Sequence, residues 1–373
     1  MRYIGLMSGT SMDGIDAVLV DCPGLNGAPL DVVSHHHVDM PVELRRSLAG
    51  LNAPGANELH LAALAANALA RCCAQAIQQV VDLAGTSAFE VRAVGAHGQT
   101  VRHRPGEFDA TGYTIQLLNG ALLAELCGID VVCDFRSRDV AAGGQGAPLV
   151  PAFHAALWGQ AGRAQAVLNL GGIGNLSLLG ADGAVGGFDC GPGNALMDLW
   201  CERHLGQAYD HDGAWAAGGH IIQPLLSILL SEPYFERIPP KSTGRDLFNA
   251  EWLDRQLALA GCGGWAAHDV QATLAELTVS AAVQALQRHA AGTQRLLVCG
   301  GGALNGHLMR RLAVNWPGLA VQTTDSLGLP VLQVEAAAFA WLAHAHLQRQ
   351  PGNRPEVTGA LGPRVLGALY PAH

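Results

Sequence analysis

Apolar residues fall into short runs and amphipathic stretches that are separated by turn residues. Residues 2–7 are mostly apolar, Ser8–Gly14 is rich in turn formers, and residues 15–20 are again mostly apolar, so we predict a β-hairpin here. From Asn57, apolar side chains recur every three or four positions until Gly85. This spacing predicts a long amphipathic helix with Asn57 as its N-cap.

The same order of elements recurs later in the chain without a repeat of the sequence. Short apolar runs bounded by turn residues predict strands at 91–96, 129–134, 166–170, 176–179, 186–189 and 296–299. Helical spacing predicts helices at 192–204, 273–291, 304–314 and 334–347. A hairpin followed by a strand and a helix thus occurs once in each half, as expected for two duplicated α/β lobes.

The length of the chain indicates two domains. A single hydrophobic core rarely serves 373 residues, and a Gly-rich connection at 141–147 separates the two halves of the pattern. We expect one lobe formed by residues 1–136 together with about 336–373, and a second lobe formed by residues 137–335.

Composition favours a well-packed protein that acts on a small molecule. Hydrophobic residues make up 49% of the chain and charged residues 14%, which supports large cores and argues against disorder. The formal charge of −9 comes without a basic stripe, so we expect neither nucleic acid nor a membrane as partner.

The nine cysteines are scattered, which argues against a disulfide framework. With no signal-peptide pattern and no long apolar run, we expect a cytoplasmic location.

Three glycine-rich turns each follow a short apolar strand: Gly9–Gly14, Gly171–Gly174 and Gly300–Gly302. Backbone amides exposed at such turns bind anions, and glycine lets the chain approach a phosphate closely. One such turn is more often an ordinary turn than a site. Three of them in one chain indicate phosphate binding.

The sequence lacks other common motifs for phosphate binding and for a nucleophilic serine. A Walker A loop needs Gly-Lys-Ser/Thr, but the only lysine, Lys241, follows Pro240. The dinucleotide fingerprint needs a third glycine that the Gly-x-Gly segments lack; these are Gly172-Ile-Gly174, Gly191-Pro-Gly193 and Gly300-Gly-Gly302. Ser8 and Ser11 do not lie in Gly-x-Ser-x-Gly, which argues against an α/β-hydrolase.

Several long motifs occur in order along nearly the whole chain. The first is Gly5-Leu-Met-Ser-Gly-Thr-Ser-Met-Asp-Gly-Ile-Asp16, and the others are Ala96–Thr100, Asp134–Asp139, Gly143–Pro148, Asn169–Asn175, Phe188–Asn194, Pro239–Arg245, Cys299–Asn305 and Glu335–Trp341. Together they resemble the anhydro-N-acetylmuramic acid kinases, members of the actin, sugar-kinase and Hsp70 superfamily.

The resemblance implies an α/β fold of two actin-like, ribonuclease H-like lobes, with mixed sheets flanked by helices and an ATP cleft between the lobes. It implies a kinase that uses ATP and Mg²⁺ to open the 1,6-anhydro ring of anhydro-N-acetylmuramic acid hydrolytically and to phosphorylate O6. The product would be N-acetylmuramic acid 6-phosphate, in peptidoglycan recycling.

The alternatives to this kinase activity are an ATPase of the same superfold with a structural or chaperone role, and a hydrolase of the superfold. The oligomeric state stays open, a homodimer included.

Asp189 is the candidate catalytic base. It follows an apolar strand and precedes Cys190-Gly-Pro-Gly, where its carboxylate would project beside the start of a helix. The alternative is that Asp189 only caps that helix. The resemblance favours the catalytic role, in which Asp189 deprotonates a water that attacks C1.

The phosphate-binding candidates follow from the three turns and the resemblance. They are Gly9, Thr10, Ser11, Met12, Asp13, Gly14, Ile15, Asp16, Gly171, Gly172, Asn175, Gly300, Gly301 and Gly302. Asp13 would hold Mg²⁺ through water, although Asp-Gly is also an ordinary turn. Asp16 would bind or stabilise the first loop. Gly300–Gly302 would lie under the adenine and ribose.

His97, Arg136 and Glu335 are the candidates for binding the sugar. Arg136 would pair with the lactyl carboxylate through two parallel hydrogen bonds, or else form a salt bridge with Asp134 or Asp139. His97 would bond a hydroxyl or be an ordinary buried histidine. Glu335 begins the last predicted helix, so it would also suit the helix dipole there.

Four further positions stand apart from these assignments. His35-His36-His37 lies on a predicted strand whose side chains alternate, so the three imidazoles cannot share one metal and are expected at the surface. Lys241 matches the family-like motif without an evident role. Cys190 and Gly174 depart from the threonine and alanine usual in the family, which bears on packing more than on activity.

Overall fold

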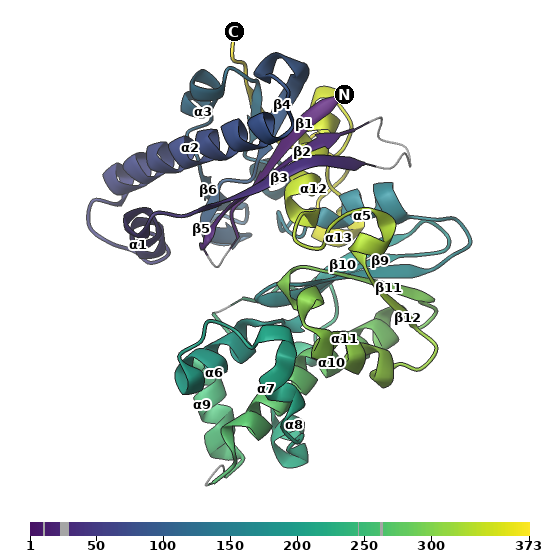
Figure 1. Cartoon of the computed structure of the whole chain (residues 1–373). Coiled ribbons are helices and arrows are strands. Elements are labelled where there is room, and N and C mark those ends of the chain that lie inside the picture. The colour runs from purple at the N-terminus through teal and green to yellow at the C-terminus, as the bar shows by residue number, and fades with distance from the viewer. Residues whose placement is uncertain (10–11, 23–29, 245, 262–263) are drawn as a thin grey trace. The chain divides into compact units, whose positions relative to one another are not determined.

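The computed structural model describes residues 1–9, 12–22, 30–244, 246–261 and 264–373. The chain forms two compact units, of which the first comprises Met1–Trp158 and Gln333–His373 and the second Gly159–Leu332 (Figure 1). The chain therefore leaves the first unit once and returns to it once. Residues 137–158, which the sequence analysis assigned to the second lobe, pack with the first unit.

The first unit contains a mixed six-stranded sheet with the order β13-β7-β4-β1-β2-β3. Its strands are β1 (Arg2–Met7), β2 (Gly14–Asp21), β3 (Asp31–Asp39), β4 (Val91–Ala96), β7 (Val131–Cys133) and β13 (Ala368–Tyr370). β1 and β2 are antiparallel, which confirms the predicted hairpin, whereas β1 and β4 are parallel. A separate hairpin joins β5 (Gln99–Pro105) to β6 (Gly112–Leu117).

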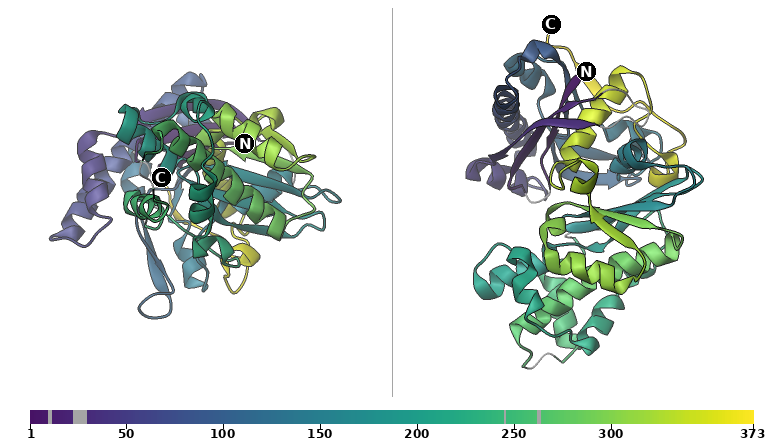
Figure 2. Two further views of the ribbon diagram at one scale, coloured as in Figure 1. Left: turned by 90° about the horizontal axis from the view of Figure 1, so that it is seen from below. Right: turned by 45° about the vertical axis from the view of Figure 1, so that its right-hand side comes forward.

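Helices cover both faces of this sheet. They are α1 (Val42–Gly50), α2 (Glu58–Leu83), α3 (Gly120–Cys127), α4 (Ser137–Ala141), α5 (Val150–Trp158), α12 (Val334–Leu347) and α13 (Pro355–Thr358), with a short 3₁₀ turn at Ala88–Glu90. Successive side chains of a strand point to opposite faces. Ile4 and Leu6 of β1 accordingly join the core formed with α2, whereas Tyr3 bonds His344 of α12 at 2.9 Å. Figures 1 and 2 show α12, in yellow, against the purple strands.

Two glycines let α12 lie directly on the sheet. A Cβ built on Gly5 of β1 would stand 1.8 Å from the carbonyl oxygen of Ala336, and one on Gly95 of β4 would stand 1.9 Å from that of Phe339. Neither distance is sterically allowed. The close packing of α12 therefore requires glycine on both strands.

The second unit contains a mixed five-stranded sheet with the order β10-β9-β8-β11-β12. Its strands are β8 (Gln165–Leu170), β9 (Ile173–Leu179), β10 (Val185–Pro192), β11 (Arg295–Cys299) and β12 (Ala320–Thr323). Its helices are α6 (Ala195–Leu205), α7 (Ala214–Ala217), α8 (Gln223–Leu230), α9 (Ala250–Leu259), α10 (Ala267–His289) and α11 (Gly306–Asn315), and 3₁₀ turns lie at η2 (His211–Gly213), η3 (Pro233–Glu236), η4 (Gly301–Leu304) and η5 (Thr324–Leu327). The core of this unit joins alternate residues of β8 to α10, which is buried along most of its length.

The two sheets share one topology apart from β13. In each, an antiparallel three-stranded meander is followed by two strands that run parallel to its first strand. The predicted α/β class with mixed sheets, and the predicted recurrence of elements, are therefore confirmed. The β1–β2 turn and the β8–β9 turn occupy equivalent positions.

The long predicted elements agree with the structure, while several ends do not. α12 has the predicted bounds, whereas α10 begins earlier, at Ala267. Asn57 lies at the N-cap position of α2, but its φ is 60° and its side chain forms no capping hydrogen bond, so its predicted capping role was wrong. Among the described residues, no helix combines the length and apolarity needed to cross a membrane.

Candidate active site

In the first unit, three candidate segments meet at one edge of the sheet. β1, β4 and β7 run parallel, so the residues that follow them lie at the same edge. The backbone N–H of His97, after β4, donates to the carbonyl of Leu6 in β1 at 3.0 Å. Ser8, after β1, donates to the side chain of Gln99. The first glycine turn, His97 and the Arg136 segment are thereby brought together.

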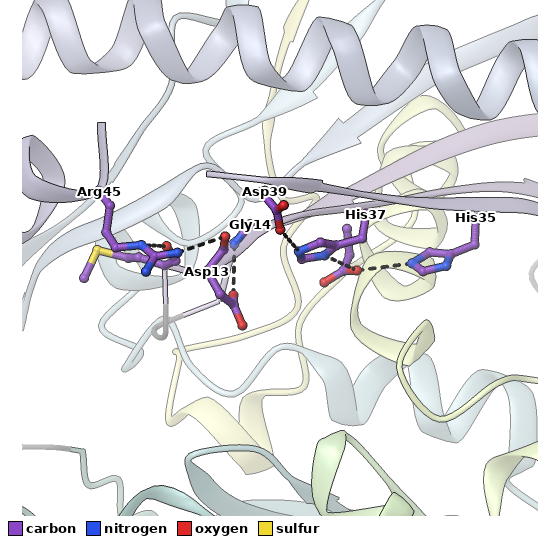
Figure 3. Close-up of polar contacts among 8 residues, drawn as sticks. Asp13, Gly14, His35, His37, Asp39 and Arg45 are labelled. Carbon is purple, nitrogen blue, oxygen red and sulfur yellow. Dashed lines mark hydrogen bonds and ion pairs between the residues drawn. The ribbon is translucent and has the colours of Figure 1, made fainter. Parts of the chain in front are cut away.

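The first glycine turn is held by main-chain and arginine contacts (Figure 3). Met12 has a left-handed backbone with a φ of 54°, and its N–H donates to the carbonyl oxygen of Gly9 at 3.2 Å. Arg45 of α1 donates to the carbonyl oxygens of Met12 at 2.8 Å and of Asp13 at 3.2 Å. Thr10 and Ser11 lie outside the described residues.

Asp13 presents an exposed carboxylate at this turn. Its Oδ1 accepts the backbone N–H of Gly14 at 3.0 Å, a contact typical of Asp-Gly turns. In the described ranges, His, Cys, Asp and Glu side chains form no cluster of three that could hold a metal. A metal at this turn would therefore have to rely on water and phosphate oxygens as well as the protein.

Asp16 is held by two histidines of β3, His35 and His37, which Figure 3 labels. His35 Nε2 and His37 Nδ1 lie 3.2 Å and 3.0 Å from its Oδ1. Burial alone would raise the pKa of Asp16, but the hydrogen bonds from the two histidines outweigh burial and lower this pKa below its ordinary value. His35 and His37 share one face of β3, as the alternation predicted, and they support the strand that leaves the glycine turn.

His97 and Arg136 contact each other directly. Nε and Nη2 of Arg136 lie 3.1 Å and 3.0 Å from Nε2 of His97. Burial and then the Arg136 guanidinium lower the pKa of His97 to about 3. The imidazole is therefore neutral at physiological pH, and because Nε2 accepts, Nδ1 carries the proton.

The two carboxylates considered as partners of Arg136 have other contacts. Asp139 is fully buried and accepts from the backbone N–H of Gly146 at 2.8 Å. Asp134 accepts the hydroxyl of Ser137. Arg136 itself donates Nη1 to the carbonyl of Gly146 at 2.9 Å.

Glu335 lies in the first turn of α12 and is half-buried. Phe339, one helical turn later, packs against His97 with ring centroids 4.9 Å apart. Residues four apart in a helix share a face, so Glu335 lies on the face of α12 that packs toward His97.

In the second unit, a row of polar residues crosses three strands. Asn169 of β8 pairs with Asn175 of β9, which pairs in turn with Asp189 of β10. Residues directly opposite one another share a face of the sheet. Their chain neighbours Leu168 and Phe188 belong to the hydrophobic core, so the polar row projects from the opposite face.

Asp189 lies inside β10 rather than at its end. The register of β10 against β9 shifts between Asp189 and Gly191, and such bulges often re-aim a side chain beside an active site. Oδ2 of Asp189 accepts the backbone N–H of Thr243 at 3.0 Å. α6 begins only at Ala195, with Asn194 at its N-cap position, so the helix predicted from residue 192 starts later.

The second glycine turn carries the start of α6. Gly193 N–H donates to the carbonyl of Gly172 at 2.9 Å, and Asn194 N–H donates to that of Gly171 at 2.8 Å. These contacts occupy the residues before the helix, which explains its late start. A Cβ on Gly171 would meet only one atom within 4 Å, at 3.7 Å, so packing within the protein leaves room beside this turn.

The third turn packs on the second. A Cβ on Gly300 would stand 2.3 Å from Oδ1 of Asn169, and one on Gly302 would stand 2.5 Å from Cβ of Leu170. Gly301, between them, is exposed and would meet only Asn194, at 3.8 Å. Contact with β8 thus requires glycine at 300 and 302. The structure brings Gly171, Gly301 and the polar row to one region of this unit.

Cys190 and Gly174 touch each other. The Cys190 thiol donates to the carbonyl of Gly174 at 3.2 Å, and a Cβ on Gly174 would stand 3.1 Å from Sγ of Cys190. Burial raises the pKa of the Cys190 thiol to about 12. The cysteine is therefore a neutral packing residue, and the absent methyl of Gly174 makes room for its sulfur.

Sequence reasoning missed two residues that contact the candidate base and one that lies in the polar row with it. They are Tyr234, Thr243 and Asn169. Asn169 interrupts an otherwise apolar strand, which is a pattern that could have revealed it. Tyr234 and Thr243 are far from Asp189 in sequence, and no local pattern connects them to it.

Comparison with known proteins shows the family of this chain. The family described as "Anhydro-N-acetylmuramic acid kinase" matches residues 1–372. Curated proteins named anhydro-N-acetylmuramic acid kinase include one from Cupriavidus pinatubonensis, 59% identical over 99% of this chain and 98% of its own length. Others are from Variovorax paradoxus, 57% identical over 99% of both chains, and Pseudomonas putida, 53% identical over 99% of both. The chain belongs to the anhydro-N-acetylmuramic acid kinase family.

Proposed function

We propose that this chain is an ATP-dependent kinase that opens the 1,6-anhydro ring of anhydro-N-acetylmuramic acid and phosphorylates O6. The observation that carries the proposal is the family match over residues 1–372, with a curated relative that is 59% identical. The product is N-acetylmuramic acid 6-phosphate, and the reaction belongs to peptidoglycan recycling in the cytoplasm. The match favours this activity over an ATPase with a structural or chaperone role.

Asp189 acts as the general base. It takes a proton from water while the water oxygen bonds to C1 of the sugar. The C1–O6 bond breaks with its electron pair on O6, O6 bonds to the γ-phosphorus, and ADP leaves. The phosphoryl group thus takes the place of the proton donor that a glycosidase would need. The hydrogen bond from Thr243 to Oδ2 of Asp189 supports this role because it favours the carboxylate.

The glycine turns hold the nucleotide. Backbone amides of the first turn and of Gly171–Gly172 bind phosphate oxygens, and Gly301 approaches the nucleoside between its two packed neighbours. Asp13 fits Mg²⁺, because this ion commonly takes one or two carboxylates and completes its shell with water and phosphate. When bound, Mg²⁺ would neutralise charge that develops on the phosphates. Asp16 keeps the first turn in place.

The sugar binds through the first unit. Arg136 pairs with the lactyl carboxylate, and His97 fixes the guanidinium by accepting two of its N–H groups. Because burial and Arg136 keep His97 neutral, no second positive charge stands behind the guanidinium. Glu335 binds a sugar hydroxyl from the first turn of α12.

Turnover with ATP, Mg²⁺ and anhydro-N-acetylmuramic acid tests the proposal. We expect ADP and sugar 6-phosphate in equal amounts, with one atom of ¹⁸O from labelled water at C1. Asp189→Asn should lower kcat by about 10²- to 10⁴-fold, as expected for loss of a general base, while ATP binding persists. ADP release that does not depend on the sugar would instead favour the ATPase, and near-normal turnover by Asp189→Asn would refute the role of Asp189.

A further inference from the structure

Lys241 is the only lysine of the chain, and the mechanism above gives it no role. It is half-buried, and its Nζ donates to the carbonyl oxygens of Tyr234 at 3.2 Å and Phe235 at 3.3 Å. Nζ also lies 4.8 Å from the ring centroid of Tyr234 and 5.6 Å from that of Phe188, within the range of cation–π attraction. The side chain therefore ties its own segment to η3 and to β10.

The residues that Lys241 ties together are those that hold Asp189. The Tyr234 hydroxyl donates to the carbonyl of Asp189 at 2.7 Å. The N–H of Asp189 donates to the carbonyl of Lys241 at 3.3 Å, and Thr243 N–H donates to the carboxylate at 3.0 Å. Burial raises the pKa of Tyr234, so its hydroxyl remains a donor. The N–H, the carbonyl and the carboxylate of Asp189 are thus each fixed by this assembly.

We propose that Lys241 is a positioning residue for Asp189, which it aims by holding Tyr234 and the backbone of Thr243 in place. The inference rests on the proposed role of Asp189 as the base. A methionine at position 241 could neither donate to the two carbonyl oxygens nor present a positive charge to the aromatic rings. Without those contacts, the segment that carries Thr243 would loosen from β10. The carboxylate would then lose a fixed donor, which favours its protonated form.

Other charged or titratable groups lie near Lys241 and the aromatic rings that it contacts, and their effects must be separated from that of Lys241 in any test. They are Glu236, Arg237, Arg288 and His289. Arg288 of α10 offers a matched control, because its Nη1 donates to the carbonyl of Phe235 at 2.9 Å, one of the two carbonyls that Lys241 bonds. Arg288 has no contact with the backbone of Thr243 or with Asp189 among the described interactions.

Steady-state kinetics across pH test the proposal on the full-length enzyme with Lys241→Met, Lys241→Arg and Arg288→Met. We expect Lys241→Met to lower kcat about tenfold or more, with KM values for ATP and sugar within about twofold. The acid limb of its kcat/KM profile should move up by roughly half a pH unit or more. Lys241→Arg, which keeps the charge and the donors, should restore the position of that limb, and Arg288→Met should leave it unchanged.

A merely structural role for Lys241 would lower Tm and the active fraction without moving the acid limb. An unmoved limb in Lys241→Met, or an equal shift in Arg288→Met, would overturn the proposal. Asp189→Asn separates this failure from that of the proposed function. If Asp189→Asn is inactive while Lys241→Met is normal, only the positioning role falls. An active Asp189→Asn removes the base assignment, and the positioning role with it.

Discussion

At the scale of single residues, the environment of a site candidate depends on contacts with residues from other parts of the chain. His97 and Arg136 were separate candidates in the sequence, and the structure joins them into one unit in which a neutral imidazole accepts from a guanidinium. Burial on this scale comes from side chains brought in by other elements, such as Phe339 of α12. No pattern local to His97 contains that information, which is why its neutrality could not be predicted.

The neutrality of His97 makes stability depend on pH. Burial, and then Arg136, lowers its pKa from 6.5 to about 3. Above pH 6.5 the residue is neutral in both states; below it, the unfolded chain takes up a proton that the folded site refuses down to about pH 3. The free energy of unfolding should therefore decrease as the pH decreases through this window. This group contributes up to about 1.4 kcal/mol per pH unit. Urea denaturation between about pH 7 and pH 5 measures the slope.

His97→Gln should flatten this dependence. Glutamine can still accept from Arg136 but does not titrate. His103 contributes a slope of its own, because burial and then Arg136 lower its pKa to about 4, so part of the dependence will remain. His60→Gln, at an exposed position of α2, is the control and should keep the full slope. A variant at position 97 with the slope of the parent protein would contradict the assigned neutrality.

At the scale of elements, periodicity was enough for the long helices and the buried strands. α12 has the bounds that apolar spacing gave it. α6 was predicted three residues too early, because Gly193 and Asn194 bond the β8–β9 turn instead of the helix. That contact joins residues more than twenty positions apart, so no window of sequence contains it.

Glycine substitutions in the sheet test the packing of α12. Gly5→Ala and Gly95→Ala would each place a methyl group within 2 Å of a backbone oxygen of α12, and a backbone atom cannot move aside cheaply. We expect each to lower the free energy of unfolding by about 1–3 kcal/mol or more. Gly50→Ala in α1, where an added Cβ would meet nothing within 4 Å, should be neutral or stabilising by about 0.5–1 kcal/mol. Chemical denaturation of the three variants under one condition decides between these outcomes.

A loss of stability in Gly50→Ala that equals that of Gly5→Ala would show that the loss does not come from steric contact with α12. Steric exclusion predicts the opposite order. Gly5→Ala should also speed amide hydrogen exchange in β1 and α12, because the added methyl group forces these two elements apart. No segment should exchange more slowly than in the parent protein.

At the scale of the whole chain, the second unit is an insertion in the first. The hydrophobic core of the second unit is formed entirely by residues between Ala166 and Val331. The first unit is completed by the last segment, because β13 pairs with β7 and α12 covers the sheet. The sequence showed the duplication of the lobes, since each lobe carries the same order of elements. The point at which the chain crosses between units depends on tertiary packing of α5, which periodicity does not report.

This arrangement predicts that removal of residues 333–373 damages the two units unequally. The first unit would lose α12, whose residues 336–345 are all buried, and it would lose the donors that Asn353 and Thr358 give to the buried carboxylate of Asp139. A buried charge that loses its partners costs about 3–5 kcal/mol by itself, out of a stability of about 5–15 kcal/mol. The second unit keeps its whole core and should stay folded.

Limited proteolysis followed by mass spectrometry measures this difference. In the truncated chain, we expect rapid cleavage within residues 1–158 and survival of a fragment close to residues 159–332. A chain that stops after Tyr370 keeps α12, α13 and β13 and should resist cleavage like the full-length protein. If the truncated chain protects residues 1–158 as well as the full chain does, then α12 and β13 only cover the first unit and are not part of its fold.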